Sequence, residues 1–275
     1  MKWAVITGAA GGMGLAAARR LIEAGWNVFG LDQQEPAPTP ALRFLRADLT
    51  DEASVAACLE PIRAATDRID AIVHLAGRYD LDSLAEMDPE ALKRIFEINL
   101  FAAARVNRLL LPLLGQGSRI VITTSELAPL DPLPFTGVYA ISKAALDRYA
   151  FSLRMEVQLL GIDVIVLRPG AVQTGMLDVS TARLDRFCEN TALYRVNAAR
   201  FRQIVGRVEA RKIPPERVAG LILRALTARR PRYVYTINRN PLLLLLNALP
   251  GRWQTAIIGH ILRTLPEQRA APGAK

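Results

Sequence analysis

The alternation of short apolar runs with helical patterns constrains the fold of this chain more than any other feature of its sequence. Several runs are continuous in valine, isoleucine and leucine rather than alternating with polar residues. Strands have this composition when helices cover both faces of their sheet. We expect strands at residues 3–7, 28–31, 42–46, 71–75, 120–124, 164–167 and 233–236.

Helical patterns lie between these runs, and their ends carry start and stop signals. Gly25 follows the first pattern at a C′ position, and Asp88 precedes Pro89 as an N-cap before the first helical residue. This alternation predicts an α/β fold, a doubly wound parallel sheet of the Rossmann type with about seven strands and helices on both faces. We expect helices at residues 14–24, 52–65, 89–114, 138–160 and 215–228.

The chain has 275 residues and no long polar or low-complexity linker, which predicts one domain over residues 1–275. Two segments depart from the regular alternation. Residues 175–212 form an arginine-rich helical insertion, and residues 241–275 form an apolar and basic C-terminal extension that contains five consecutive leucines. No uninterrupted apolar stretch reaches the ~20 residues that a membrane span needs.

Charge is distributed unevenly along the chain. Residues 168–275 hold 19 lysines and arginines against 6 aspartates and glutamates, residues 1–167 hold 16 against 20, and the net charge is +9. Such asymmetry indicates an acidic ligand, a membrane surface or nucleic acid, or only a basic solvent-facing surface. Cys58 and Cys188 match no metal or redox spacing, so we expect no metal site and a reducing, cytoplasmic setting.

A glycine-rich turn, TGAAGGMG at residues 7–14, follows the first strand and opens the first helix. Glycines allow the backbone to turn tightly and to approach a pyrophosphate closely. The helix N-terminus then supplies unpaired N–H groups and the positive end of its dipole. We therefore expect a dinucleotide to be held here by Gly8, Gly11, Gly12, Met13 and Gly14.

Asp32 ends the second strand, 18 residues after Gly14. A carboxylate at this position accepts hydrogen bonds from the adenosine ribose hydroxyls and repels a 2′-phosphate. Gln33 and Gln34 follow, and no adjacent arginine is present to hold that phosphate. The sequence therefore predicts NAD in preference to NADP.

Tyr139 and Lys143 are four residues apart, which places them on one face of a helix. A lysine held near a phenol favours the phenolate, so we expect the pKa of Tyr139 to be lowered. A tyrosine with a lowered pKa is a general acid/base able to work near neutral pH.

With these residues in place, roughly residues 1–240 resemble the short-chain dehydrogenase/reductase family in its single-domain form. The family's adenine-contacting pair matches Asp48-Leu49. Its Asn-Asn-Ala-Gly motif matches His74-Leu75-Ala76-Gly77, which departs at the first two places and keeps Ala76 and Gly77 beside the cofactor. The segment at the nicotinamide end matches Pro169, Gly170, Val172 and Thr174.

The resemblance also implies a catalytic tetrad of Asn99, Ser125, Tyr139 and Lys143. Ser125 is expected to hydrogen-bond the substrate oxygen, and Tyr139 to exchange a proton with it. Lys143 is expected to bind the nicotinamide ribose, and Asn99 to hold a water next to that lysine. The implied activity is NAD-dependent hydride transfer between a secondary alcohol and a ketone.

The substrate is expected to be bulky and apolar, such as a steroid, retinoid, terpenoid or acyl chain. In the family, the segment that corresponds to residues 175–212 covers the substrate, and apolar residues 127–135 precede Tyr139. Packing of this segment onto the body is the competing explanation of these residues. The motifs are also compatible with an NADP-dependent ketoreductase of an acyl or polyketide-type substrate, a sugar-nucleotide-type epimerase or a nucleotide-sensing protein.

We expect no nucleic-acid partner, because the basic residues follow no recognition motif. The leucines and arginines of residues 241–275 indicate a peripheral membrane contact, a subunit interface or a floor for the substrate site. The long helices expected at residues 89–114 and 138–160 resemble those that pair in family homodimers and homotetramers.

Overall fold

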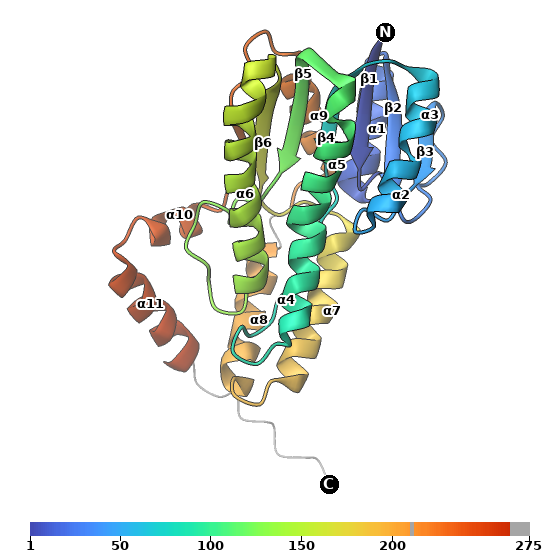
Figure 1. The fold of residues 1–275 in the computed structure, drawn as a ribbon. Coiled ribbons are helices and arrows are strands. Elements are labelled where there is room, and N and C mark those ends of the chain that lie inside the picture. Colours follow the sequence, from blue (N-terminus) through green and yellow to red (C-terminus); the bar gives the residue numbers. More distant parts are fainter. Residues whose placement is uncertain (210–211, 265–275) are drawn as a thin grey trace.

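A computed structural model of the chain describes residues 1–209 and 212–264, together with their side chains apart from 176–182, 205–209 and 264. Its centre is a sheet of seven parallel strands in the order β3-β2-β1-β4-β5-β6-β7 (Figure 1). The predicted doubly wound sheet is therefore confirmed. The strands are β1 (Lys2–Thr7), β2 (Trp26–Asp32), β3 (Leu42–Arg46), β4 (Ile69–His74), β5 (Leu114–Thr123), β6 (Asp163–Pro169) and β7 (Val234–Ile237).

Helices cover both faces of the sheet. α1 and α9 pack against each other on one face, and α5 and α6 lie on the other (Figure 1). The strand order reverses direction between β1 and β4, and ligands of doubly wound sheets bind beyond the strand ends at this point. These helices are α1 (Gly12–Glu23), α2 (Glu52–Ala57), α3 (Leu59–Ala65), α4 (Pro89–Phe96), α5 (Ala102–Leu110), α6 (Gly137–Val157) and α9 (Pro215–Thr227).

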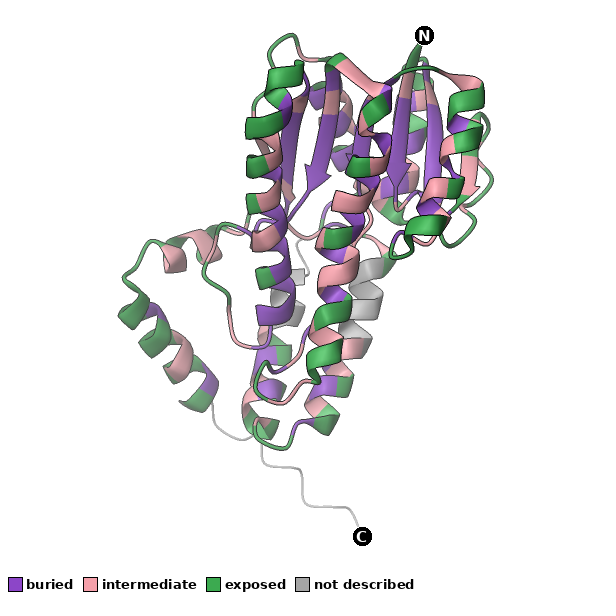
Figure 2. Ribbon diagram, viewed as in Figure 1, coloured by how far each residue is buried: buried purple, intermediate pink, exposed green. Residues whose placement is uncertain are grey.

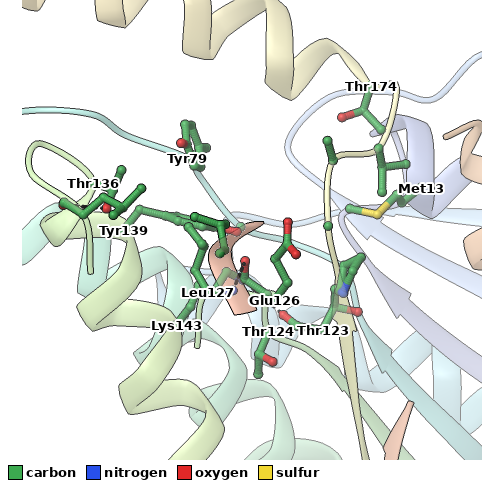
Figure 3. A pocket seen from close by; sticks show the side chains of 18 of the residues that line it. Met13, Tyr79, Thr123, Thr124, Glu126, Leu127, Thr136, Tyr139, Lys143 and Thr174 are labelled. Carbon is green, nitrogen blue, oxygen red and sulfur yellow. Dashed lines mark hydrogen bonds between the residues drawn. The ribbon is translucent and has the colours of Figure 1, made fainter. Parts of the chain in front are cut away.

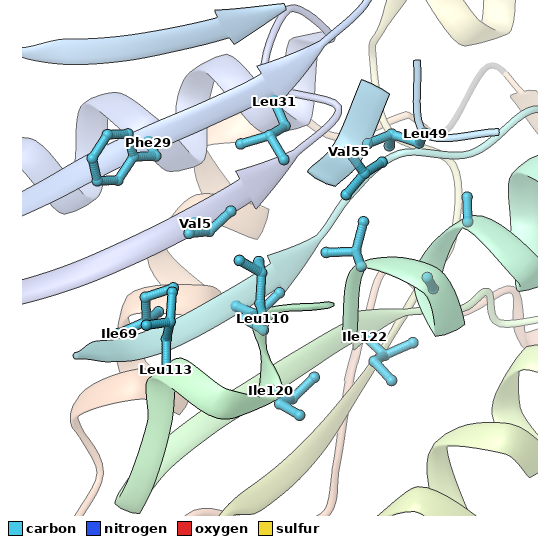
Figure 4. Packing of buried hydrophobic residues seen from close by; sticks show 14 of the residues in the cluster. Val5, Phe29, Leu31, Leu49, Val55, Ile69, Leu110, Leu113, Ile120 and Ile122 are labelled. Carbon is cyan, nitrogen blue, oxygen red and sulfur yellow. The ribbon is translucent and has the colours of Figure 1, made fainter. Parts of the chain in front are cut away.

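The largest apolar cluster fills the space between the sheet and the α5–α6 face (Figure 4). Val5, Ile72, Ile120 and Leu110 are all fully or almost fully buried in it. The strands are buried along most of their length, in agreement with their continuous apolar runs (Figure 2). Burying each such side chain stabilises the fold by about 1.5–3 kcal/mol, which makes the strand ends a rigid platform for the site.

Two predicted helices are interrupted. The helix expected over residues 52–65 divides at Cys58, because Pro61 has no N–H to donate to the carbonyl one turn earlier. The helix expected over residues 89–114 contains a π-helical segment at Glu97–Phe101 and ends in a 3₁₀ turn at Leu111–Leu113. β5 then begins at Leu114, six residues before the strand expected at 120–124.

The signals at the helix ends are borne out. Asp88 caps α4 by accepting a hydrogen bond from the Glu90 N–H at 3.0 Å. Gly25 has a left-handed φ of 82° immediately after the end of α1, where its amide donates to the Ile22 carbonyl. These local features were readable because each depends on neighbours within one helical turn.

The insertion and the C-terminal extension supply four further helices, α7 (Gly175–Asn190), α8 (Arg195–Glu209), α10 (Pro241–Asn247) and α11 (Gly251–Thr264). α8 is tied to α11 by Asn197 and Arg200, whose side chains donate to the Leu262 carbonyl at 2.9 and 2.8 Å. The expected boundaries at 175–212 and 241–275 stay predictions, and residues 210–211 and 265–275 lie outside the described residues. Within residues 1–209 and 212–264, no helix is long and apolar enough to cross a membrane.

Candidate active site

A cavity of about 180 Å³ opens at the carboxyl ends of the strands (Figure 3). Residues from both halves of the sheet, from the insertion and from the C-terminal extension line it together. The lining includes Met13, Gly77, Ser125, Tyr139, Lys143, Pro169, Gly170, Val172 and Thr174, all of which the sequence predicts for the site, and also Tyr79, Glu126, Phe201, Ile204 and Leu243.

The glycine-rich turn is shaped by close backbone contacts. Gly8 has a left-handed φ of 72°, and a Cβ placed there would lie 2.6 Å from the Ala76 amide nitrogen at the end of β4. A Cβ on Gly14 would lie only 2.0 Å from the Gly8 carbonyl oxygen, whereas one on Gly11 would meet its nearest atom at 3.4 Å. Gly8 and Gly14 are therefore required by the turn itself.

The turn leaves a cradle that fits a pyrophosphate. A Cβ on Gly12 would lie 3.0 Å from the Thr174 side chain across the cavity. The first amides of α1 have no side-chain cap, so they are available to an anion at the helix N-terminus. Gly12 therefore lets the turn pack closely against Thr174, and the uncapped amides at the N-terminus of α1 lie beside this contact.

Asp32 lies at the end of β2 with its carboxylate against the glycine-rich turn. Oδ2 accepts a hydrogen bond from the Ala10 N–H at 3.0 Å, and Oδ1 accepts one from the Gln34 N–H at 3.1 Å. Arg46 is the register partner of Asp32 on β3. The sequence reasoning missed this basic neighbour, because it is 14 residues away along the chain. The described residues contain no ion pair between Asp32 and Arg46.

Asp48 and Leu49 follow β3. The Asp48 carboxylate accepts hydrogen bonds from the Thr50 hydroxyl at 2.6 Å and the Thr50 N–H at 2.9 Å, and these bonds lower its pKa. Leu49 is buried, and its carbonyl accepts a hydrogen bond from Arg105 at 2.7 Å. The structure thus gives both residues clear structural partners, and their contact with adenine stays a prediction.

Tyr139 and Lys143 lie one turn apart near the N-terminus of α6, both buried and both facing the cavity. The Lys143 ammonium donates to the Thr123 carbonyl at 3.1 Å and lies 5.9 Å from the centre of the Tyr139 ring. Behind them, Asp147 of α6 accepts two hydrogen bonds from Arg168 of β6, at 2.9 and 2.7 Å. This paired contact fixes α6 against the sheet.

Ser125 follows the end of β5 and is hydrogen-bonded through its side chain to Tyr139. Its hydroxyl also accepts a hydrogen bond from the Leu127 N–H at 3.2 Å, which holds the serine in a tight turn. The structure therefore brings the serine, the tyrosine and the lysine to one end of the cavity.

Asn99 lies in the π-helical segment, slightly removed from the other three. Its amide exchanges hydrogen bonds with the backbone of Arg78, at 2.7 and 2.9 Å, and donates to the Ser142 hydroxyl at 2.9 Å. A Cβ on Gly77 would be 3.2 Å from both the Asn99 Oδ1 atom and the Lys143 Nζ atom. Gly77 thus keeps the space between Asn99 and Lys143 open, and π-segments of this kind are frequent at functional sites.

The electrostatics of Tyr139 differ from the sequence-based expectation. Burial raises the pKa of the Tyr139 phenol to about 12, the hydrogen bond with Ser125 opposes this shift, and the charge of Glu126 adds to it. Burial lowers the pKa of the Lys143 ammonium to about 8. The expectation of a lowered tyrosine pKa is therefore wrong for the chain alone, because burial outweighs a lysine whose charge is directed at a backbone carbonyl.

Residues 169–174 cross the cavity opposite Tyr139. The Gly170 N–H donates to the Ile237 carbonyl at 2.9 Å, and Asn238 donates to the Ala171 carbonyl at 2.8 Å. Val172 forms a parallel bridge with Ile213. β7 and the chain after the insertion thus hold the predicted segment in place.

His74 replaces the family's first motif asparagine and is satisfied internally. Its Nε2 atom lies 2.8 Å from the Asn107 Oδ1 atom, and Asn107 in turn donates to the Tyr149 hydroxyl at 3.1 Å. Burial lowers the pKa of His74 to about 4, and the hydrogen bond with Asn107 opposes the shift. The imidazole is therefore neutral near pH 7 and joins β4 to α5 and α6.

The sequence reasoning did not single out three of the cavity residues. The Tyr79 ring packs edge-on against the Tyr139 ring, with the ring centres 4.5 Å apart. Leu243 reaches the cavity from α10, which the sequence could not single out among five leucines. Glu126 was readable only as an acidic residue directly after Ser125 in an otherwise apolar stretch.

The chain matches the family model described as short chain dehydrogenase over residues 2–185. It is 25% identical to the NADPH-dependent 3-dehydrocapnine reductase of Ornithobacterium rhinotracheale, over 98% of this chain and 100% of that protein. It is also 25% identical to the 3-ketodihydrosphingosine reductase of Bacteroides thetaiotaomicron, over 90% of this chain and 91% of that protein. A short-chain dehydrogenase structure from Streptomyces avermitilis matches with a TM-score of 0.72 and 22% identity, over 94% of this chain and 95% of that one.

The fold and the family match define the class, an NAD(P)-dependent oxidoreductase that acts on an alcohol or a ketone. The chain belongs to the short-chain dehydrogenase/reductase family. This membership favours an oxidoreductase over an epimerase or a nucleotide-sensing protein. It leaves the substrate, the choice between NAD and NADP and the individual residue roles to be argued from the site.

Proposed function

We propose that the chain interconverts a secondary alcohol and a ketone on a bulky apolar substrate, with NAD as the hydride carrier. One observation carries this proposal: a single cavity joins the buried Ser125, Tyr139 and Lys143 cluster to an apolar wall. The insertion and the extension supply part of that wall. Its apolar members include Leu75, Leu127, Leu133, Phe201, Ile204 and Leu243.

The chemistry follows from the placement of three side chains. In oxidation, the alcohol would lose a proton from its oxygen and a hydride from its carbon, for which a bound nicotinamide dinucleotide would supply the hydride acceptor. Ser125 holds the substrate oxygen, and Tyr139 takes the proton, or returns it during reduction. Lys143 lies beside the open space at Gly77, where its ammonium fits the ribose hydroxyls and favours the phenolate.

The preference for NAD rests on Asp32. Its charge lies against the turn that fits the phosphates, where it repels a 2′-phosphate. Two observations favour NADP instead: Arg46 lies beside Asp32, and one relative carries an NADPH-dependent name. We give Asp32 the greater weight because it contacts the turn directly.

The direct test is a substrate screen followed by variants. Steroid, terpenoid and long-chain acyl alcohols and ketones, with the keto compounds after which the two relatives are named, are assayed with NAD and NADP by the absorbance of the reduced coenzyme. Tyr139→Phe is expected to abolish turnover and to leave coenzyme binding largely intact. Near-wild-type turnover by that variant would overturn the assigned role of Tyr139.

We also propose that α10 and α11 contact an anionic membrane surface. Leu242, Leu245 and Trp253 expose more than half of their surface, and Arg252 and Arg263 are exposed on the same segment. Apolar side chains flanked by arginines are complementary to a lipid surface with negative headgroups. Leu243 of α10 meanwhile lines the cavity, so the same helix joins this surface to the substrate site.

Co-sedimentation with vesicles tests this contact. Binding to phosphatidylserine-containing vesicles at low salt, loss of binding at high salt, and weak binding to pure phosphatidylcholine are expected. A Leu245→Ser/Trp253→Ser double variant should bind less. Absence of binding at low salt would overturn the membrane proposal. A homodimer that this double variant dissociates would also overturn it and would indicate a subunit interface instead. The expected homodimer or homotetramer through the long helices stays a prediction.

A further inference from the structure

Glu126 is a buried carboxylate in the wall of the cavity, between the reacting residues and the apolar wall. It directly follows Ser125, is only 9% exposed, and lines the cavity with the reacting residues. In Figure 3 its carboxylate points into the space between Tyr139 on one side and Met13 and Thr174 on the other. Desolvating a charge in this way is costly unless the charge gains a partner.

The protein satisfies this carboxylate only in part. Oε2 accepts one hydrogen bond, from the Asn240 N–H at 2.6 Å. Among the residues whose side chains the structure describes, no lysine, arginine or histidine forms an ion pair with it. Arg239 lowers its pKa from a distance, but burial has the larger effect and raises it.

The backbone around Glu126 is arranged to keep the carboxylate in the cavity. The Glu126 N–H donates to the Pro169 carbonyl at 2.9 Å, which fixes the start of the side chain. A Cβ on Gly170 would lie 2.0 Å from the Asn238 carbonyl oxygen and 2.8 Å from the Oε1 atom, so the backbone after β7 requires glycine here, and the same glycine leaves room for the carboxylate. The side chain is thus held between the ends of β5 and β6, next to the reacting groups.

Glu86 shows what a purely structural carboxylate looks like in this chain. Its two oxygens accept hydrogen bonds from the Thr191 hydroxyl at 2.6 Å and from the amides of Ala192 and Leu193 at 2.8 and 3.1 Å. The hydrogen bond with Thr191 is the main reason that its pKa is lowered. Glu126 has one such bond where Glu86 has three, and the balance of effects on its pKa has the opposite sign.

We propose that Glu126 is a binding subsite for an ammonium group on a substrate carbon adjacent to the one that is oxidised or reduced. The substrate class is then a long-chain amino alcohol or amino ketone, with its alkyl chain against Phe201, Ile204 and Leu243. An ammonium supplies both the charge and the hydrogen-bond donors that Oε1 lacks. This inference rests on the proposed function, because it places the reacting carbon at Ser125 and Tyr139.

The test compares a long-chain 2-amino-alkan-3-ol with the matched alkan-3-ol, using the wild type and Glu126→Gln. The glutamine oxygen can still accept the hydrogen bond from the Asn240 N–H. The substitution preserves the side-chain volume and removes only the charge. We expect kcat/KM of the wild type to favour the amino alcohol by about 10- to 100-fold, and Glu126→Gln to bring the ratio of the two kcat/KM values close to one. Glu60→Gln on the exposed face of α3 controls for removal of a negative charge.

A binding measurement separates failure of this inference from failure of the proposed function. A long-chain primary amine and the alcohol of equal length are titrated into both proteins by calorimetry, which requires no turnover. The amine should bind Glu126→Gln about 10- to 100-fold more weakly than the wild type, with no change for the alcohol. Equal amine affinities, or an equal loss of activity on both substrates, would overturn the inference. Amine selectivity in binding without turnover of any substrate would instead count against the proposed function alone.

Discussion

Replacing Asp32 with asparagine tests the proposal that the charge of this residue selects between the two coenzymes. The asparagine oxygen can still accept the Ala10 N–H hydrogen bond that ties this side chain to the glycine-rich turn. The variant therefore retains the turn and loses one negative charge. It also removes the negative charge beside Arg46, the register partner of Asp32, whose guanidinium can attract a phosphate.

The expected magnitude follows from Coulomb's law. A 2′-phosphate carries about two negative charges. At about 5 Å from one carboxylate charge, this gives a repulsion of about 2 kcal/mol in water and more at a lower local dielectric constant. Relief of that repulsion improves NADP binding about 30-fold, since 1.4 kcal/mol corresponds to a factor of ten. Loss of a charge-assisted hydrogen bond weakens NAD binding by about 1 kcal/mol. The NAD-to-NADP preference should therefore fall by about 100-fold.

Coenzyme affinity is measured by calorimetry or tryptophan quenching, so the assay does not depend on knowing the substrate. Glu35→Gln removes the same charge three residues away and should change the preference by less than about threefold, because exposed charges are strongly screened. If Asp32→Asn leaves the ratio of the two dissociation constants unchanged, Asp32 does not select the coenzyme. A wild type that binds NADP more tightly than NAD would contradict the reasoning outright.

Two further predictions concern stability. Gly14→Ala should destabilise the fold by about 1–3 kcal/mol in urea unfolding and weaken coenzyme binding, because its Cβ would clash with the Gly8 carbonyl. Gly11→Ala, whose Cβ has room, should be nearly neutral. Equal effects of the two substitutions would refute the steric argument. Since the pKa of His74 is about 4 when folded and about 6.5 when unfolded, stability should rise by about 3 kcal/mol between pH 4 and 6.5. His74→Asn should lose this part of the pH dependence, and an unchanged slope in that variant would refute the assignment.

The fold and much of the site could be predicted because their signals are local. A strand buried on both faces has a continuous apolar sequence, and Asp32, Ser125 and Pro169 lie at or directly after strand ends. The parallel topology gathers such ends at one edge of the sheet. Residue type, order and the helical spacing of Tyr139 and Lys143 were therefore sufficient to place these two residues in one cavity with Ser125 and Pro169.

The remaining features depend on contacts between distant segments. Glu126 meets Asn240, which is 114 residues away in the sequence, and Tyr79 meets Tyr139 across 60 residues. The π-helical turn that presents Asn99 leaves no local mark in the sequence. The pKa of Tyr139 was mispredicted for the same reason, because burial is a property of the whole fold and outweighs a neighbour one helical turn away.

The proposed substrate ammonium connects Glu126 to the pKa of Tyr139. In the proposed mechanism, oxidation needs the Tyr139 phenolate, but burial and the Glu126 charge both raise the pKa of Tyr139. Lys143 opposes this effect only weakly, because its own pKa is lowered by burial and its ammonium donates to the Thr123 carbonyl. A substrate ammonium beside Glu126 cancels the unfavourable carboxylate field at the phenol. Glu126 would therefore hinder the general base only for substrates without an amine, so that binding and catalysis would select the same substrate class.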